Sequence, residues 1–188
     1  MKQALQKTVP NQEKDSIATV LSSKLDDCKI VISALSDEQF TLITPYNTNP
    51  DKMHSSVGQH MRHVIEFIQT LIDSFGPGHV DYDVRQRNKQ IEENRTVATS
   101  VVQGLQEKLD KLTTNDFEIP MTMTEAVHVT EEFLPQKSSF GRELLFAIAH
   151  TEHHFALIGA KCDQMGVALP DNFGKAISTL RYELGLTQ

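Results

Sequence analysis

The chain has 188 residues, of which 39% are hydrophobic and 23% charged, and its formal net charge at pH 7 is -7. A chain of this length can bury one hydrophobic core without disulfides, so we expect a single domain with tails. The acidic balance argues against nucleic acid and anionic membrane surfaces as partners, because both attract clustered Lys and Arg.

Two further features indicate a cytoplasmic protein. Cys28 and Cys162 are the only cysteines, and their separation is typical of a reducing compartment and excludes a Cys-rich zinc site. The first residues lack the apolar segment of a signal peptide, and no run of roughly 18 apolar residues predicts a membrane-spanning helix. We therefore expect a cytoplasmic protein without a membrane partner.

The N-terminal part predicts a polar lead-in followed by a helix and a loop. Residues 1–11 are polar and end near a proline. Over residues 12–35, apolar side chains recur at three- and four-residue spacing, as in a helix that faces a core. The stretch TPYNTNPDKMH, residues 44–54, is rich in Pro and Asn and predicts a loop.

The second predicted helix has a clear start and end. Ser56 and Gln59 have the spacing of a capping box, so the helix should begin near Val57. The glycines and proline of FGPGH, residues 75–79, should end it. An apolar stripe between these limits indicates a face buried in the core.

The C-terminal part predicts two more long helices separated by extended chain. Residues 83–112 are highly charged at first and then amphipathic, which predicts one long helix. Residues 117–136 are rich in Thr, Val, Phe and Ile, and prolines at both ends favour a β-hairpin or an extended segment. The last long helix should begin near Ser138 or Ser139 and end at Gly166.

These elements predict an all-α fold, a four-helix bundle over residues 12–166 with a short β insertion before the last long helix. Residues 167–188 form a C-terminal extension, with one short helix expected from about Asn172 to Tyr182. The interior of such bundles is a usual place for metal sites built from facing helices.

Histidines cluster on two of the predicted helices. Five of the eight lie there: His60, His63, His150, His153 and His154. His150 and His154 are one turn apart, so both imidazoles can reach a single cation. The alternatives are hydrogen bonds to buried carbonyl or carboxylate groups such as Glu66 or Glu92, or exposure to solvent.

Helical geometry alone favours His60 over His63 as the inward donor of the second helix. His60 lies at the edge of the apolar stripe, and His63 lies farther round the helix. His153 projects about 60° away from the midpoint between His150 and His154, which indicates a supporting or surface position.

The segments SVGQHMRHVIEF and LLFAIAHTEHHFALIGAKCDQMG resemble the DinB/YfiT-like superfamily of metal-dependent proteins. The resemblance covers about residues 12–166 and implies an up-down-down-up bundle, often dimeric, that holds a divalent cation on three histidines. Aligning the helix starts implies that His63, His150 and His154 are the ligands, with His60 as the alternative to His63. Zinc or nickel is the implied metal, and iron and manganese are further candidates.

The segment DYDVRQRNKQIE, residues 81–92, also resembles a motif of one subgroup. Its charged and aromatic side chains either line a pocket beside the metal or form a solvated, salt-bridged helix start; they are Tyr82, Asp83, Arg85, Arg87 and Glu92. Candidates for proton transfer near the metal are Glu66, Tyr82 and Glu92. The segment NFGKAISTLRY resembles the closing part of the same subgroup.

Three neutral imidazoles leave coordination positions open, which is typical of a reactive metal site. The first hypothesis is an enzyme in which the metal activates water or a small thiol, with thiol transfer ahead of hydrolysis and a low-molecular-weight thiol as a partner. The second is a non-catalytic, stress-related bundle that binds a metal or a ligand. The third is a helical interaction module without metal. The resemblance also implies a homodimer.

Overall fold

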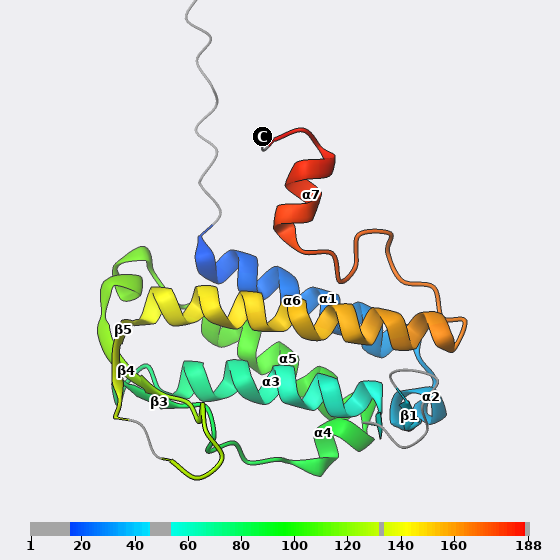
Figure 1. Ribbon diagram of the computed structural model, residues 1–188, viewed down its shortest axis with the longest axis horizontal. Coiled ribbons are helices and arrows are strands. Elements are labelled where there is room, and N and C mark those ends of the chain that lie inside the picture. The colour runs from blue at the N-terminus through cyan, green and yellow to red at the C-terminus, as the bar shows by residue number, and fades with distance from the viewer. Residues whose placement is uncertain (1–15, 46–53, 132–133, 187–188) are drawn as a thin grey trace, which may run out of the picture.

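Four long helices form the bundle in the computed structural model, which describes residues 16–45, 54–131 and 134–186. They are α1 (Ile17–Ala34), α3 (Val57–Asp73), α5 (Arg95–Leu109) and α6 (Phe140–Gln164) (Figure 1). The predicted lead-in and most of the predicted loop over residues 44–54 lie outside the described residues.

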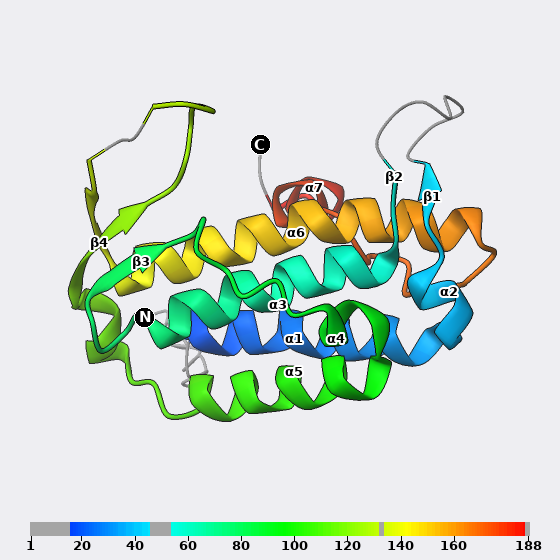
Figure 2. The same ribbon diagram turned by 90° about the horizontal axis from the view of Figure 1, so that it is seen from below.

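The helices follow an up-down-down-up order. The helices α1 and α6 run in one direction, and α3 and α5 run in the other (Figures 1 and 2). Each helix packs against two others, because α1 and α3 both contact α5 and α6. The predicted bundle topology is therefore confirmed.

The core is formed by the apolar stripes of all four helices. Its fully buried members include Leu21, Leu25 and Cys28 of α1, Val64, Ile65 and Ile68 of α3, Val102 of α5, and Leu144 and Ile158 of α6. The stripes recur at three- and four-residue spacing, so each helix turns one face to the others and the opposite face to solvent.

The start of α3 is fixed by the predicted capping box. The Ser56 hydroxyl accepts a hydrogen bond from the Gln59 amide, and Gln59 Oε1 accepts one from the Ser56 amide, both at 3.0 Å. Gly58 follows in the first turn and lies against two short helices, α2 (Asp37–Thr41) and α4 (Lys89–Glu93). A Cβ at Gly58 would lie 2.1 Å from the carbonyl oxygen of Glu92. This contact brings α4 close to the end of α3 that carries the histidines.

The prediction of a single helix over residues 83–112 is wrong in its first part. Residues 84–88 have no regular secondary structure, and two helices, α4 and α5, follow them. The side chain of Asn88 caps α4, and that of Asn94 accepts hydrogen bonds from the amides of Thr96 and Val97 and caps α5. Each Asn satisfies backbone donors at a helix start and has an extended backbone, so one continuous helix does not pass through either position.

Two small sheets flank the bundle. The strands β4 (Pro120–Thr124) and β5 (Gln136–Ser139) are antiparallel, which confirms the predicted hairpin. A third strand, β3 (His79–Asp81), pairs in parallel with β4 and was not predicted. At the other end of the bundle, β1 (Thr44–Pro45) pairs with β2 (His54–Ser55). A 3₁₀ helix at Thr114–Glu118 follows α5.

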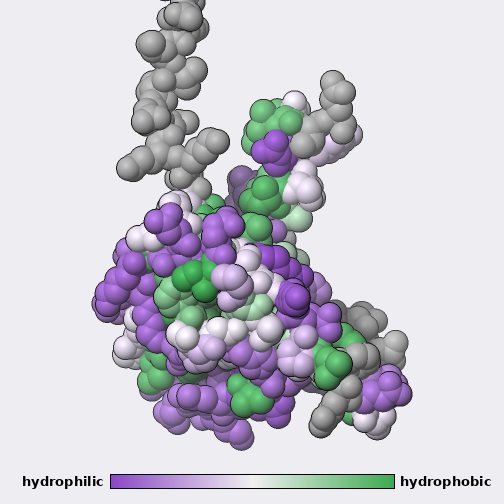
Figure 3. Space-filling model, turned by 90° about the vertical axis from the view of Figure 1, so that its left-hand side faces the viewer, coloured by the Kyte–Doolittle hydropathy of each residue, from purple (hydrophilic) through white to green (hydrophobic). Residues whose placement is uncertain are grey.

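The C-terminal extension crosses α6 before it forms its helix, α7 (Ile177–Glu183). Phe173 stacks on Phe155 of α6 with ring centroids 4.8 Å apart. The helix begins five residues later than predicted and projects from the body (Figure 3). Its apolar side chain Ile177 is exposed, and Leu184, which follows the helix, is exposed as well. None of the helices in the described ranges is long and apolar enough to cross a membrane.

Candidate metal centre

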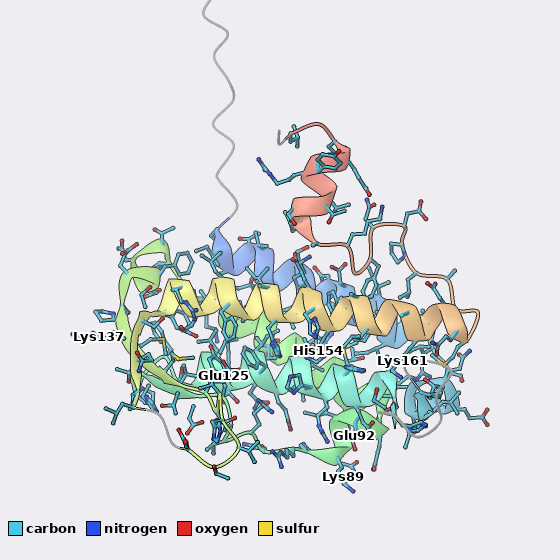
Figure 4. All side chains as sticks on the ribbon, in the orientation of Figure 1. Lys89, Glu92, Glu125, Lys137, His154 and Lys161 are labelled. Atoms are coloured by element: carbon cyan, nitrogen blue, oxygen red, sulfur yellow. The ribbon has the colours of Figure 1, made fainter. Side chains whose placement is uncertain are left out.

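The antiparallel packing of α3 on α6 brings three histidines together. His63 comes from α3, and His150 and His154 come from successive turns of α6. One ring nitrogen from each lies within 4.8 Å of the others, and His63 Nε2 is 2.8 Å from His150 Nε2. Figure 4 shows His154 in the space between the two helices. The structure thus places in one cluster the three histidines that the resemblance implied.

Burial keeps these imidazoles neutral at physiological pH. It is the main cause that lowers the pKa of His63 and His154 to about 3 and that of His150 to about 4. The guanidinium of Arg85 is the second cause for His63. A neutral imidazole has one nitrogen lone pair available, which is the form that binds a metal ion.

His60 lies beside the cluster and contacts it through His154. The Nδ1 atoms of His60 and His154 are 3.0 Å apart, and His60 Nε2 lies 2.9 Å from the Ser55 hydroxyl. His60 is also the more buried of the two candidates on α3, as its position at the edge of the apolar stripe predicted. The less buried His63 is nevertheless the histidine of α3 that belongs to the cluster, because its ring faces His150.

Aromatic rings support the other side of the cluster. Phe67 stacks on His150 and also on Tyr82, in each case with ring centroids 4.1 Å apart. The Tyr82 hydroxyl donates a hydrogen bond of 2.7 Å to Glu143, whose side chain is fully buried. Burial and this carboxylate raise the pKa of Tyr82 well above its usual value. Tyr82 is therefore separated from His150 by the ring of Phe67.

The two glutamates predicted for proton transfer are held by neighbouring groups. Glu66 Oε1 accepts a hydrogen bond of 2.6 Å from the Asn88 amide. Glu92 forms an ion pair with Arg62, and the same arginine lies 3.8 Å from Glu66. Both glutamates are buried, and their contacts connect α3 to the start of α4. Their role in proton transfer stays a prediction.

The rest of the segment 81–92 is divided between the cluster and the surface. Arg85 is half-buried and donates a hydrogen bond to the Tyr82 carbonyl. Its charge also contributes to the lowered pKa of His150. Asp83 and Arg87 are exposed, and Asp83 accepts a hydrogen bond of 2.6 Å from the Ala126 amide in the hairpin. His153 is exposed as well, in agreement with its predicted supporting or surface position.

Two contacts of the site were not predicted from the sequence. Lys161, which is only 1% exposed, donates hydrogen bonds to β1 and β2, and Ser55 of β2 contacts His60. Lys161 lies seven residues after His154, a spacing that places both side chains on one face of α6. This spacing, in a segment almost without charge, is the signal that could have identified Lys161.

The donor set fits a single divalent ion. A tetrahedral zinc ion with Zn–N distances of about 2.0–2.1 Å holds two ligand nitrogens roughly 3.3 Å apart. One ring nitrogen each of His63, His150 and His154 lies within 4.8 Å of the others, which is close to this spacing. Three ligands leave at least one coordination position for another molecule.

A family model described as the DinB superfamily matches residues 24–158, which include all three clustered histidines. The chain belongs to the DinB superfamily. Solved structures of this fold agree with the topology described above. YfiT from Bacillus subtilis, a probable metal-dependent hydrolase with an unusual four-helix bundle topology, has a TM-score of 0.58 and 16% identity, over 89% of this chain and 95% of that one.

Two other proteins show the same fold or a related sequence. A DinB-like protein of Bacillus subtilis, YjoA, has a TM-score of 0.55 and 18% identity, over 82% of this chain and 95% of that one. FK506-binding protein 5 of Rhizopus delemar is 32% identical over 104 residues, which are 55% of this chain. The match spans only 27% of that fungal protein's own length.

Proposed function

We propose that this DinB-superfamily protein is a metal-dependent enzyme that activates a small nucleophile at one divalent ion held by His63, His150 and His154. The observation that carries the proposal is the convergence of three neutral imidazoles from α3 and α6 on one point. Zinc and nickel are the metals that we propose, and both are among the ions that imidazole ligands suit. When bound, the ion supplies Lewis acidity that lowers the pKa of a thiol or a water molecule at the open position.

A low-molecular-weight thiol is the preferred nucleophile because it needs the least help from the protein. A free thiol has a pKa of about 8.5, whereas bulk water has a pKa of about 15.7. Among the described residues, the group that can hold a metal consists of histidines alone. Glu66 and Glu92, the nearest candidates for a general base in the sequence, are engaged by Arg62 and Asn88.

Arg85 would assist by charge. Its guanidinium lies close enough to His63 and His150 to help lower the pKa of both rings. A cation there favours the anionic form of a thiol over the neutral form. The first reaction that we propose is therefore a substitution, in which the thiol loses its proton to solvent and its sulfur forms a C–S bond with an electrophilic carbon as the bond from that carbon to a leaving group breaks. Hydrolysis is the second, and the description of YfiT as a probable metal-dependent hydrolase supports it.

Metal binding is tested first, and the reaction is tested second. The affinity of the untagged protein for Zn²⁺ and Ni²⁺ is measured by competition with a chromophoric chelator. We expect one site per chain, lost in His63→Ala and His150→Ala. The matched control is His153→Ala, because His153 is exposed on the same helix. Loss of binding in the control alone, or no binding in the wild type, would contradict the proposal.

The loaded protein is then incubated with small thiols and electrophilic acceptors, and in parallel with ester and amide substrates. Thiol consumption that requires both the metal and His63 supports the transferase. Hydrolysis with the same requirement supports the second reaction instead. A loaded protein that turns over neither class would favour the non-catalytic alternative, a bundle that only binds a metal or a ligand.

A further inference from the structure

We propose that Lys161, Ser55 and His60 form a positioning chain that fixes the ring orientation and tautomer of His154. The inference rests on the proposed function, because it assigns His154 as a metal ligand. It concerns residues that do not themselves belong to the three-histidine cluster. The chain runs from Lys161 in the last turn of α6, through Ser55 of β2, to His60 in the first turn of α3, and it returns to α6 at His154.

The first step is the contact between the two histidines. With Nδ1 of His154 only 3.0 Å from Nδ1 of His60, one of these nitrogens donates and the other accepts. His154 can offer Nε2 to a metal only if its proton is on Nδ1. The Nδ1 proton of His154 is then donated to His60. A ligand histidine commonly donates its second ring nitrogen in this way, which orients the ring and makes it a better ligand.

The second step fixes His60. Because Nδ1 of His60 accepts from His154, the proton of the neutral His60 ring is on Nε2. Nε2 lies 2.9 Å from the Ser55 hydroxyl and donates to that oxygen. Each ring nitrogen of His60 therefore forms a hydrogen bond, Nδ1 with His154 and Nε2 with Ser55. This explains why His60, although more buried than His63, supports the cluster and does not enter it.

The third step fixes Ser55. Its backbone carbonyl accepts a hydrogen bond of 2.8 Å from the ammonium of Lys161. The same ammonium donates to the carbonyl and the hydroxyl of Thr44, at 2.9 and 3.1 Å. A buried ammonium must find such acceptors, because an unpaired one is costly to desolvate. Lys161 thus ties β1 and β2 to α6, and Figure 4 shows it farther along that helix than His154.

The roles of the chain are tested by metal binding in three variants. His60→Phe keeps the ring volume and removes both hydrogen bonds, and His60→Asn restores an acceptor near the position of Nδ1. Lys161→Met removes the ammonium together with its charge near His60, and it leaves His60 and the three clustered histidines themselves unchanged. The control is Lys89→Met, at an exposed position on α4. Zn²⁺ affinity is measured by chelator competition, and the visible spectrum of the Co²⁺ form reports the geometry of the site.

We expect His60→Phe to weaken Zn²⁺ binding by about 10–100-fold and to change the Co²⁺ spectrum, as is typical for loss of such supporting contacts. His60→Asn should recover most of the affinity. Lys161→Met should act in the same direction by a smaller factor, and Lys89→Met should have no effect. Thermal unfolding of the metal-free variants measures any general loss of stability, which alone would leave the Co²⁺ spectrum of the folded protein unchanged.

Two results would overturn the inference. If His60→Phe and Lys161→Met bind Zn²⁺ with wild-type affinity and give the wild-type Co²⁺ spectrum, the positioning chain is wrong, although the proposed function stands when His63→Ala has lost the metal. If the wild type itself binds no metal, both proposals fail together.

Discussion

Replacement of Gly58 by alanine tests how closely α3 and α4 approach. A Cβ at this position would lie 2.1 Å from the Glu92 carbonyl oxygen and 3.0 Å from Cε1 of Phe40. Ordinary contact begins at 3.4 Å, so the Glu92 carbonyl of α4 would have to move by about 1.3 Å. Overpacking of this kind costs about 1–3 kcal/mol. We expect Gly58→Ala to lower the free energy of unfolding by this amount.

The matched control is Gly104→Ala in α5. An added Cβ there meets no atom within 4 Å, and alanine loses less conformational freedom in a helix than glycine does. This variant should be more stable than the wild type by about 0.5–1 kcal/mol. Urea-induced unfolding followed by circular dichroism measures both changes. A Gly58→Ala protein as stable as Gly104→Ala would refute the close approach of α4 to α3.

Three other expectations follow from buried polar groups. Tyr82→Phe removes the hydrogen bond to Glu143 and should lower the free energy of unfolding by about 1.5–3 kcal/mol. Tyr182 is 73% exposed, so Tyr182→Phe should change this free energy by less than about 0.5 kcal/mol, and equal urea midpoints of the two variants would contradict the prediction. Burial raises the pKa of Cys28 above its usual range and that of Cys162 to about 11, so a thiol reagent at pH 8 should label both cysteines only after denaturation. Fast labelling of the native protein would show an exposed thiol and would contradict this prediction. The clustered histidines have pKa values of about 3 to 4 in the folded protein, below the 6.5 of the unfolded chain, so the metal-free protein should keep their contribution to the free energy of unfolding above pH 6.5 and lose it as pH falls toward 4. If replacing His63 and His154 with Gln leaves the pH dependence of this free energy between pH 6.5 and 4 unchanged, the assignment of these pKa values is wrong.

Local signals in the sequence predicted much of the fold. Ser56 and Gln59 specify the start of α3 because a capping box depends only on residues within one turn. The strand β3 was not predicted, because it has only three residues, too few for a recognisable pattern. Its partner strand β4 also lies about 40 residues away in the sequence. The sequence predicts a helix through residues 84–88 unless Asn88 and Asn94 are recognised as the caps of two separate helices.

The candidate site shows a similar division. The spacing of His150 and His154 predicts a shared face of α6 from the geometry of one helix. The choice between His60 and His63 depends on the position of α6 relative to α3, which no pattern within α3 contains. Burial pointed to His60, whereas the packing of the two helices brings His63 to the cluster. The contact of Lys161 with β1 and β2 likewise joins residues more than 100 positions apart.

The most direct test of the metal centre is a crystal structure of the protein soaked with Zn²⁺, with an anomalous difference map collected at the zinc edge. We predict one strong peak per chain at about 2.0–2.1 Å from a ring nitrogen of each of His63, His150 and His154. The absence of a peak between α3 and α6, with zinc found only on exposed histidines such as His79 or His153, would contradict the account.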